Sequence, residues 1–453
     1  MFTILFGRVP GQLVIQITNY CNASCPQCGM RKTAGIKRQK LSESRVKDII
    51  NQCVLNGIDA VSLTGGEPFI EIPETMELLD YARQRGIIYL RSGTNGYMFT
   101  HEGQAAGIEK IDSFVKTLAA SGIRNFWISM DSADTQTHEA MRGLPGVIGG
   151  IEKALPLFHA RGLYPAVNLG INRNIAGRPV PPVREAGDEA PFFEAMKAGF
   201  DAFFSKAIAL GFTMANVCYP MSSGRDGLAE EEAAYGAIAA DEVICFSPVE
   251  LRLIFKALLE IIPCFRDRIR IFTPLSSLYA LSREDSLSLF PCLGGIRHFY
   301  MDNKGRLYPC GYRGNEDLGE DMSEAVRRTK DLKGFCKKCH WECFRDPAQL
   351  FGIARYIIRH PVRGFIQKRI DSLRRVHTQE PACAGEPWGV TKGMYPESKY
   401  LVRTTYPAAC GGVVDPAMLK LWFKDIAYYI RNDFFNGRKP GRLRGTNGKK
   451  EAV

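Results

Sequence analysis

The chain has 453 residues, of which 45% are hydrophobic and 24% charged, a composition typical of a globular protein rather than of a repeat or a disordered polymer. No apolar run reaches the roughly 18 residues of a membrane helix, and residues 1–18 lack the basic start, apolar block and cleavage site of a secretory signal. The net charge of +11 favours an anionic surface or substrate without identifying one. We therefore expect a cytoplasmic protein, either free or peripheral at a membrane.

Apolar strand candidates alternate with amphipathic helix candidates over the first half of the chain. Such alternation predicts a parallel sheet with helices outside it, and six units predict a partial (β/α)6 TIM-type barrel with ligands at the carboxyl ends of the strands. Strands are predicted at residues 13–18, 60–64, 87–92, 125–130, 164–171 and 212–219. Helices are predicted between them, near residues 42–56, 73–86, 105–120, 147–161 and 191–209.

The rest of the chain is divided by composition. Pro and Gly enrichment predicts a long loop at 174–191 over the carboxyl face of the sheet, and residues 230–285 read as helical. The fold class is thus α/β, a partial barrel followed by a small cysteine-rich hairpin domain and a helical basic region. The expected divisions are a barrel at 1–225, a helical connection at 226–288, a cysteine-rich domain at 289–346, a C-terminal region at 347–435 and a basic flexible tail at 436–453.

Fourteen cysteines need a reason in an intracellular chain, because the reducing cytosol disfavours structural disulfides. Eight of them form two groups in the sequence. Four others have apolar neighbours and are predicted to be small buried core residues: Cys53, Cys218, Cys245 and Cys264.

The first group follows strand 13–18 as a C-x3-C-x2-C loop made by Cys21, Cys25 and Cys28. Three thiolates on a tight loop can bind three irons of a [4Fe–4S] cluster, which leaves the fourth iron open to a cofactor or substrate. A zinc site is the alternative, but a structural zinc ion needs four ligands and no nearby histidine supplies the fourth.

A glycine turn follows the second predicted strand, where Gly65, Gly66, Glu67 and Pro68 stand in LTGGEPFI, and a TNG sequence at 94–96 follows the third. A cysteine triplet and a GGEP turn after successive strands resemble the radical SAM superfamily. The resemblance implies that the open iron chelates the methionine moiety of S-adenosylmethionine (SAM). It also implies that the small glycines let the backbone approach the methionine ammonium, which Glu67 helps to hold.

The same resemblance gives roles to residues of later strands. Ser129 would meet the ribose hydroxyls, Arg142 would pair with the methionine carboxylate, and Asn168 or Asn172 would contact ribose or adenine. The plainer alternatives are strand filler for Ser129, a solvated helix charge for Arg142 and ordinary strand or turn polar groups for the two asparagines. Gln27 departs from the family, in which the residue before the third cysteine is often aromatic and touches adenine.

The second group contains five cysteines: Cys292, Cys310, Cys336, Cys339 and Cys343. Alternation around the DNKG sequence predicts a hairpin with its turn at Gly305, which brings the first two thiols together. Four thiolates of this kind can bind an iron–sulfur cluster or zinc. The pattern resembles the auxiliary-cluster domains called SPASM and twitch. It fits twitch better, with one [4Fe–4S] cluster on the first four cysteines and Cys343 as a substitute ligand.

Two further cysteines, Cys383 and Cys410, are the alternative source of ligands for a second auxiliary cluster. The radical SAM resemblance implies that SAM is cleaved reductively to a 5′-deoxyadenosyl radical, which abstracts hydrogen from a substrate C–H bond. It also implies a reductant such as flavodoxin or ferredoxin, with the auxiliary cluster assisting an oxidation. No specific nucleic-acid partner is expected.

The substrate is open to several hypotheses. Residues 350–376 mix apolar side chains with regularly spaced arginines, which fits contact with an anionic membrane or a phosphorylated or lipid-linked small molecule. An amphipathic helix packed on the barrel with a solvated basic face is the plainer interpretation. The alternatives for the whole chain are a peptide- or protein-modifying maturase of the SPASM type and a non-catalytic iron–sulfur or zinc module, and the GGEP turn argues against the module.

Overall fold

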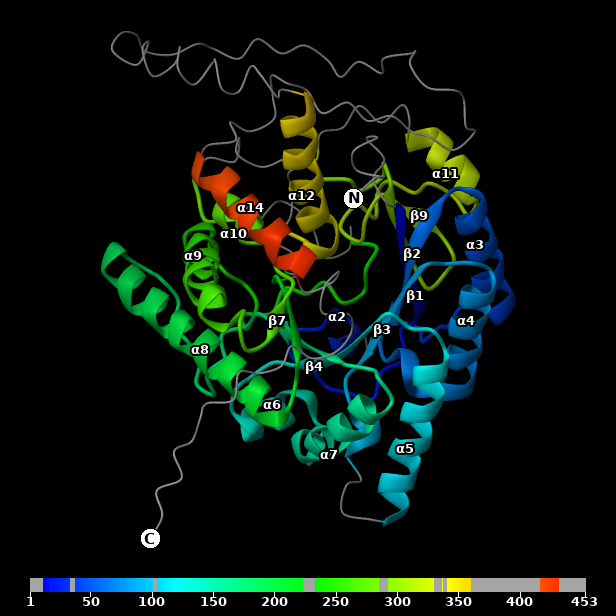
Figure 1. Ribbon diagram of the computed structural model, residues 1–453, viewed down its shortest axis with the longest axis horizontal. Coiled ribbons are helices and arrows are strands. Elements are labelled where there is room, and N and C mark those ends of the chain that lie inside the picture. The colour runs from blue at the N-terminus through cyan, green and yellow to red at the C-terminus, as the bar shows by residue number, and fades with distance from the viewer. Residues whose placement is uncertain are drawn as a thin grey trace.

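A single curved sheet organises the computed structural model, with helices arranged around its outside (Figure 1). The nine strands lie in the order β7-β6-β5-β4-β3-β2-β1-β8-β9. The structure describes residues 11–32, 37–100, 105–220, 222, 233–284, 292–329, 336, 340–359 and 416–431.

The six predicted strands are confirmed, and neighbouring ones pair in parallel. They are β1 (Gly11–Thr18), β2 (Ile58–Gly65), β3 (Tyr89–Thr94), β4 (Asn125–Met130), β5 (Ala166–Gly170) and β6 (Met214–Cys218). Their outward side chains, such as Leu63, Phe126 and Val167, are wholly buried against the helices. The parallel arrangement places all six carboxyl ends at one edge of the sheet.

Three strands were not expected as parts of this sheet. β7 (Arg270–Ile271) extends it beyond β6, and β8 (His298–Met301) pairs in parallel with β1 at the other side. β9 (Leu307–Tyr308) returns antiparallel to β8, with Gly305 at φ +87° in the turn, so the predicted hairpin is confirmed. The sheet therefore runs through the boundaries expected near residues 225 and 289.

The five predicted helices are α3 (Glu43–Leu55), α4 (Ile72–Gln84), α5 (Ala105–Ala120), α7 (Val147–Ala160) and α8 (Glu189–Leu210). Short helical turns follow the strands: α2 (Gly29–Lys32), η1 (Pro68–Glu71), η2 (Tyr97–Phe99), α6 (Thr135–Arg142) and η3 (Ala186–Asp188). The loop predicted at 174–191 is shorter in the structure: residues 172–185 contain no regular element, but η3 begins at Ala186 and α8 at Glu189. The region 230–285 is helical only in α9 (Pro248–Phe265) and α10 (Leu275–Leu281), because residues 233–247 form turns.

The C-terminal region returns to the barrel through α12 (Glu342–Arg359) and α14 (Pro416–Tyr429), while α11 (Met322–Thr329) packs on α3 (Figure 1). Asp425 on α14 is fully buried and accepts hydrogen bonds from the Leu275 and Ser276 backbone and from the Ser276 hydroxyl. Its carboxylate also lies 2.9 Å from Arg266 Nη1. One aspartate therefore joins the last described helix to the start of α10.

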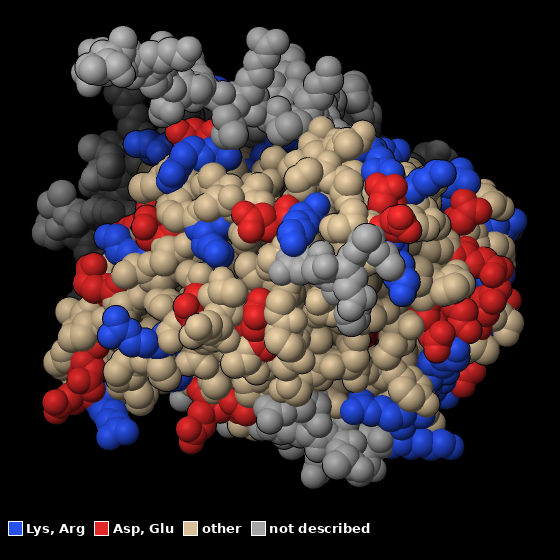
Figure 2. All heavy atoms as spheres, turned by 90° about the horizontal axis from the view of Figure 1, so that it is seen from below, with Lys and Arg blue, Asp and Glu red and all other residues tan. Residues whose placement is uncertain are grey.

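The surface carries mixed charge, and acidic and basic side chains are interspersed over the face drawn in Figure 2. Within the described ranges, no helix has the length and apolar character needed to cross a membrane. The prediction that four scattered cysteines are core residues is wrong for Cys264, which lies on the exposed side of α9. It is correct for Cys53, which is fully buried, while Cys218 and Cys245 are only half-buried. Cys383, Cys410 and the basic residues at 360–415 and 432–453 lie outside the described residues.

Candidate SAM and iron–sulfur sites

The cysteine triplet occupies the loop that leaves the carboxyl end of β1. Cys25 is buried, and burial raises the pKa of its thiol to about 12, while Cys21 and Cys28 are half-buried. The Ala23 backbone N–H donates to Cys21 Sγ at 3.4 Å, and Asn95 Nδ2, at the end of β3, lies 3.7 Å from the same sulfur. None of the described cysteines forms a disulfide. The loop therefore carries three thiols that are available as ligands, with N–H donors already directed at the first.

The two glycines of the GGEP turn allow the β2 loop to lie against the cysteine loop. A Cβ on Gly65 would lie 2.4 Å from the Thr18 carbonyl oxygen, and a Cβ on Gly66 would lie 2.1 Å from the Tyr20 carbonyl oxygen. Backbone hydrogen bonds of 2.9 and 2.8 Å, from Gly66 to Thr18 and from Glu67 to Tyr20, hold the loops together. Any side chain at either glycine would force these loops apart. The absence of a side chain is thus needed for packing against the loop that carries Cys21.

Glu67 is fully buried, and each oxygen of its carboxylate accepts a backbone hydrogen bond. Oε1 accepts from Phe69 N at 3.0 Å and Oε2 accepts from Asn95 N at 2.7 Å. Burial raises the pKa of this carboxyl to about 7 against the opposing effect of these donors. Pro68 begins η1 directly after it and is also buried. Glu67 therefore joins the ends of β2 and β3 next to the cysteine loop.

Arg142, at the end of α6, is buried rather than a solvated helix charge. Its Nε and Nη2 lie 2.9 and 3.0 Å from the two carboxylate oxygens of Asp131, at the end of β4. The Arg142 carbonyl accepts from Ser24 N at 2.8 Å, within the cysteine loop. A guanidinium group has five N–H donors, so the pair with Asp131 leaves others for an anionic ligand. The adjacent His138 Nδ1 accepts from Asp131 N, and burial lowers the pKa of this imidazole to about 4.

The remaining predicted SAM contacts divide between the inward face of the sheet and its edge. Ser129 and Asn168 are cross-strand partners on β4 and β5, and both are half-buried. Asn168 Oδ1 accepts from Asn216 Nδ2 at 2.8 Å. Asn172 is fully buried and donates to the Asp131 carbonyl at 2.7 Å, so its amide joins the ends of β4 and β5. Ser129 and Asn168 keep their predicted roles as hypotheses, while Asn172 already has structural partners.

Cysteines of the second group lie together next to the β8–β9 hairpin. Cys292 and Cys310 are buried, and with half-buried Cys336 they lie in one apolar cluster around Trp341 and Phe344. The Cys292 backbone donates to the Cys336 carbonyl at 3.2 Å. Cys339 lies outside the described residues. Three of the four predicted ligands therefore share one site.

Two arginines lie near these thiols. Burial raises the pKa of Cys292, while Arg345 and Arg313 favour its thiolate electrostatically. Arg345 Nη2 also donates to the Cys336 carbonyl at 3.2 Å. A cluster bound by four thiolates carries negative charge, which these guanidinium groups would offset. Cys343 packs against the same apolar cluster, and its thiol donates to Glu342 Oε1 at 3.5 Å.

Residues 235–238 connect the two cysteine sites. Gly29, next to Cys28, donates to the Ala237 carbonyl at 3.2 Å, and Tyr235 N donates to the Gly311 carbonyl at 2.9 Å beside Cys310. The Tyr235 ring stacks on Trp341 with centroids 5.9 Å apart. One short segment therefore contacts both sites.

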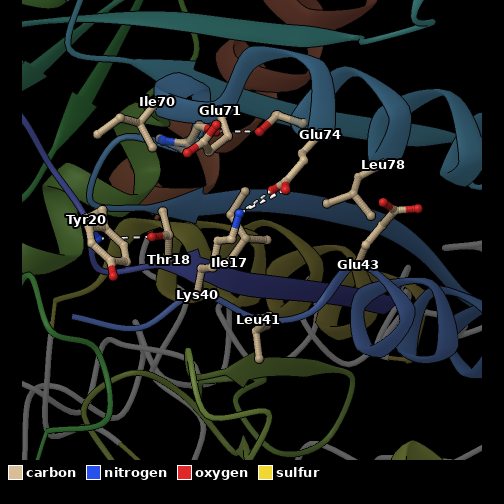
Figure 3. A pocket seen from close by; sticks show the side chains of 12 residues that line it. Ile17, Thr18, Tyr20, Lys40, Leu41, Glu43, Ile70, Glu71, Glu74 and Leu78 are labelled. Atoms are coloured by element: carbon tan, nitrogen blue, oxygen red, sulfur yellow. Dashed lines mark hydrogen bonds and ion pairs between the residues drawn. The ribbon is translucent and has the colours of Figure 1, made fainter. Parts of the chain in front are cut away.

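A cavity of about 300 Å³ lies on the helix side of β1, between β1, η1 and α4 (Figure 3). Its lining includes Thr18, Tyr20 and Pro68, and Lys40 pairs with Glu74 across it at 2.9 Å. None of the three loop cysteines lines it. The cavity is therefore separate from the inward face of the sheet.

The donor set fits the predicted cluster. No three His, Cys, Asp or Glu side chains in the described parts of the chain are grouped to bind a single metal ion. The thiolates of a [4Fe–4S] cluster each bind a different iron and need no such grouping. The loop provides three thiols and no histidine, and two of these thiols are half-buried rather than buried. Such a loop is suited to a [4Fe–4S] cluster.

The sequence matches the family model of the radical SAM superfamily over residues 15–171, which span β1 to β5. Residues 15–171 of the chain belong to the radical SAM superfamily. The radical SAM enzyme is 23% identical over 365 residues to the "AdoMet-dependent heme synthase" of Methanosarcina barkeri, covering 75% of this chain and 91% of that protein. It is 31% identical over 173 residues to the "Probable GTP 3′,8-cyclase" of Pyrococcus abyssi, covering 37% of this chain and 51% of that protein.

Among solved structures, the radical SAM enzyme is similar to SuiB of Streptococcus suis bound to S-adenosylmethionine. The TM-score is 0.44 at 17% identity, with 67% of this chain and 60% of SuiB covered. Sequence analysis had identified the cysteine and GGEP residues. It assigned no role to Asp131, Asn95 or Arg91, because only the fold shows what these polar side chains contact.

Proposed function

We propose that this radical SAM enzyme binds a [4Fe–4S] cluster through Cys21, Cys25 and Cys28 and uses it to cleave SAM. The observation that supports this is the packing of the cysteine loop against the GGEP turn at the carboxyl edge of the sheet. When bound, the cluster and SAM would supply a 5′-deoxyadenosyl radical able to abstract hydrogen from a substrate C–H bond. Glu67 fixes the loops, and Arg142 offers its remaining N–H donors to the methionine carboxylate.

The second site supports an oxidative outcome. We assign an auxiliary [4Fe–4S] cluster to Cys292, Cys310 and Cys336, with Cys339 as the fourth ligand. The arginines next to these buried thiols would stabilise a negatively charged group there against the cost of burial. Such a site can accept an electron from a substrate radical, and a protein such as flavodoxin or ferredoxin would supply the electron for SAM cleavage.

The relatives favour a small molecule as substrate. Proteins named AdoMet-dependent heme synthase align with 75% and 83% of this chain, and haem is a small molecule rather than a peptide. The net charge of +11 favours an anionic substrate. We propose oxidation of an anionic small molecule, with modification of a peptide as the second candidate.

The experiment that tests this proposal replaces the three cysteines of the first cluster site and leaves the second site intact. Anaerobically reconstituted wild type should hold about eight irons, and the triple Cys21/Cys25/Cys28→Ala variant should keep about half of them and lose SAM cleavage by dithionite-reduced protein. Cys264→Ala, a cysteine substitution on the exposed side of α9, is the matched control and should behave as wild type. SAM cleavage by the triple variant would contradict the proposal.

The auxiliary site has its own test. A Cys292/Cys310→Ala variant should lose about half of the iron and still cleave SAM. Stoichiometric zinc in the anaerobically purified wild type, with only about four irons, would identify the second site as a zinc site instead.

A further inference from the structure

The inward face of the central strands is polar and incompletely covered. Along β4, β5 and β6, half-buried side chains alternate with wholly buried ones that face the helices. The inward positions include Trp127, Asn168, Asn216 and Cys218. Polar and aromatic groups that remain partly accessible in the middle of a sheet are typical of a ligand-binding face.

Arg91 places a cation on this face. It lies on β3 in register with Ser62 and Asn125, and its guanidinium carbon lies 5.7 Å from the centroid of the Trp127 ring. Its Nε is buried without a hydrogen-bond partner, and no ion pair joins it to a carboxylate of any described residue. A guanidinium in such a place has lost water without gaining an ion pair, and a bound anion would supply one.

The Cys343 thiol and the Glu342 carboxyl group, at the start of α12, both interact electrostatically with this arginine. Glu342 accepts from the Cys343 thiol and from Tyr219 N, at 3.5 and 3.4 Å. Cys218 donates to Asn168 Oδ1 at 3.2 Å on the facing strands. The Glu342 carboxyl group is thus engaged by the Cys343 and Tyr219 donors, and it forms no ion pair with Arg91.

We infer that Arg91, together with the Cys343 thiol, binds an oxyanion of the substrate, a carboxylate or a phosphate. This inference rests on the proposed function and specifies its substrate. Arg91 precedes Asn95, whose amide contacts Cys21, by four residues, which is about 13 Å along a strand. The oxyanion therefore anchors the substrate at a distance from the carbon that reacts. Cys343 belongs to this substrate site, and the auxiliary cluster uses the four other cysteines of its group.

The test follows the reactivity of Cys343 in anaerobically reconstituted protein. Iodoacetamide labelling of the Cys343 peptide is measured by mass spectrometry in chloride, propionate or inorganic phosphate at equal ionic strength. Propionate or phosphate should slow labelling at least threefold relative to chloride, and the more effective salt identifies the oxyanion. Arg91→Gln should abolish the protection and Arg91→Lys should retain part of it. Arg85→Gln, an exposed arginine at the end of α4, should retain all of it.

Three results would overturn the inference. The first is equal labelling in all three salts. The second is protection that survives in Arg91→Gln of normal iron content. The third is a Cys343 that is unreactive until the clusters are chelated away, which would make it an auxiliary ligand. If Cys343 does not react in either state, quenching of the Trp127 fluorescence by the same salts, absent in Trp127→Phe, decides instead.

SAM cleavage by the same wild-type preparation separates this inference from the proposed function. Protein that cleaves SAM but shows no anion effect contradicts only the oxyanion site. Protein that shows the anion effect but never cleaves SAM contradicts only the proposed function.

Discussion

Replacing Glu67 by Gln or Ala separates two roles for the GGEP glutamate. If its carboxylate bound the methionine ammonium of SAM directly, loss of the charge in either variant would weaken SAM binding. In the structure both oxygens instead accept backbone hydrogen bonds, from Phe69 and Asn95. Glu67→Gln keeps one acceptor, while Glu67→Ala leaves two buried N–H groups unsatisfied, at about 1–3 kcal/mol each.

The raised pKa of Glu67 determines whether the free energy of unfolding rises or falls with pH. Because the carboxyl titrates at about 7 in the folded chain and near 4.5 when unfolded, its stabilising effect is complete below pH 4.5 and is lost as the pH rises to about 7. At about 1.36 kcal/mol per pKa unit, the loss is about 2 kcal/mol at pH 6 and about 3.3 kcal/mol at pH 8. Gln does not titrate. The free energy of unfolding of Glu67→Gln, relative to wild type, should therefore rise by about 1.3 kcal/mol from pH 6 to pH 8.

Two assays check this. Urea unfolding at pH 6 and pH 8 measures the relative stability, and equilibrium SAM titration of reconstituted protein measures affinity. We expect Glu67→Gln to bind SAM within about threefold of wild type and Glu67→Ala to bind about ten- to a hundredfold more weakly, since 1.4 kcal/mol is about tenfold. Glu71→Gln, an exposed neighbour, is the matched control. A Gln variant that is as stable as expected but binds SAM as weakly as Ala would refute the positioning role.

Further predictions concern two of the buried ion pairs. Asp131→Ala and Arg142→Ala should each lower the free energy of unfolding by about 3–5 kcal/mol, because each single change leaves a buried charge unpaired. The double variant should lose clearly less than the sum of the two. Additive losses in urea unfolding would contradict this. Arg142→Ala should also weaken SAM binding about ten- to a hundredfold in the same titration. Asp425→Ala should increase hydrogen exchange throughout α14, whereas Lys424→Ala on its exposed side should not.

The features that could be predicted from the sequence are those that depend on neighbouring residues in the chain. Six strands and five helices follow from apolar periodicity, and the cysteine and glycine motifs marked the correct edge of the sheet. The helix α6 was missed because TQTHEAMR is almost wholly polar, yet His138 and Arg142 within it are buried. Their burial depends on Asp131, a partner that periodicity cannot show. Cys264 was misassigned because its apolar neighbours line the other side of α9.

Long-range pairing was also beyond sequence reasoning. The hairpin of β8 and β9 was predicted from alternation around Gly305, but its parallel alignment with β1 joins residues nearly three hundred positions apart. The role of Arg91 was missed for a related reason. An arginine within a strand looks like an edge residue until the partner strands and Trp127 show that it faces inward.

The pairing of β8 with β1 limits how this architecture can be recombined. Four consecutive residues of β1, Gln12 to Ile15, pair with His298 to Met301 of β8. The hairpin that leads to Cys310 and the strand that leads to the first cysteine loop therefore belong to the same sheet. An auxiliary region exchanged with that of a relative as an independent module would leave one side of β1 without hydrogen-bond partners. A productive chimera must therefore carry β1 and the hairpin together, or preserve their register residue by residue. The spacing between the two cysteine sites would then be inherited as a property of one sheet rather than of a linker.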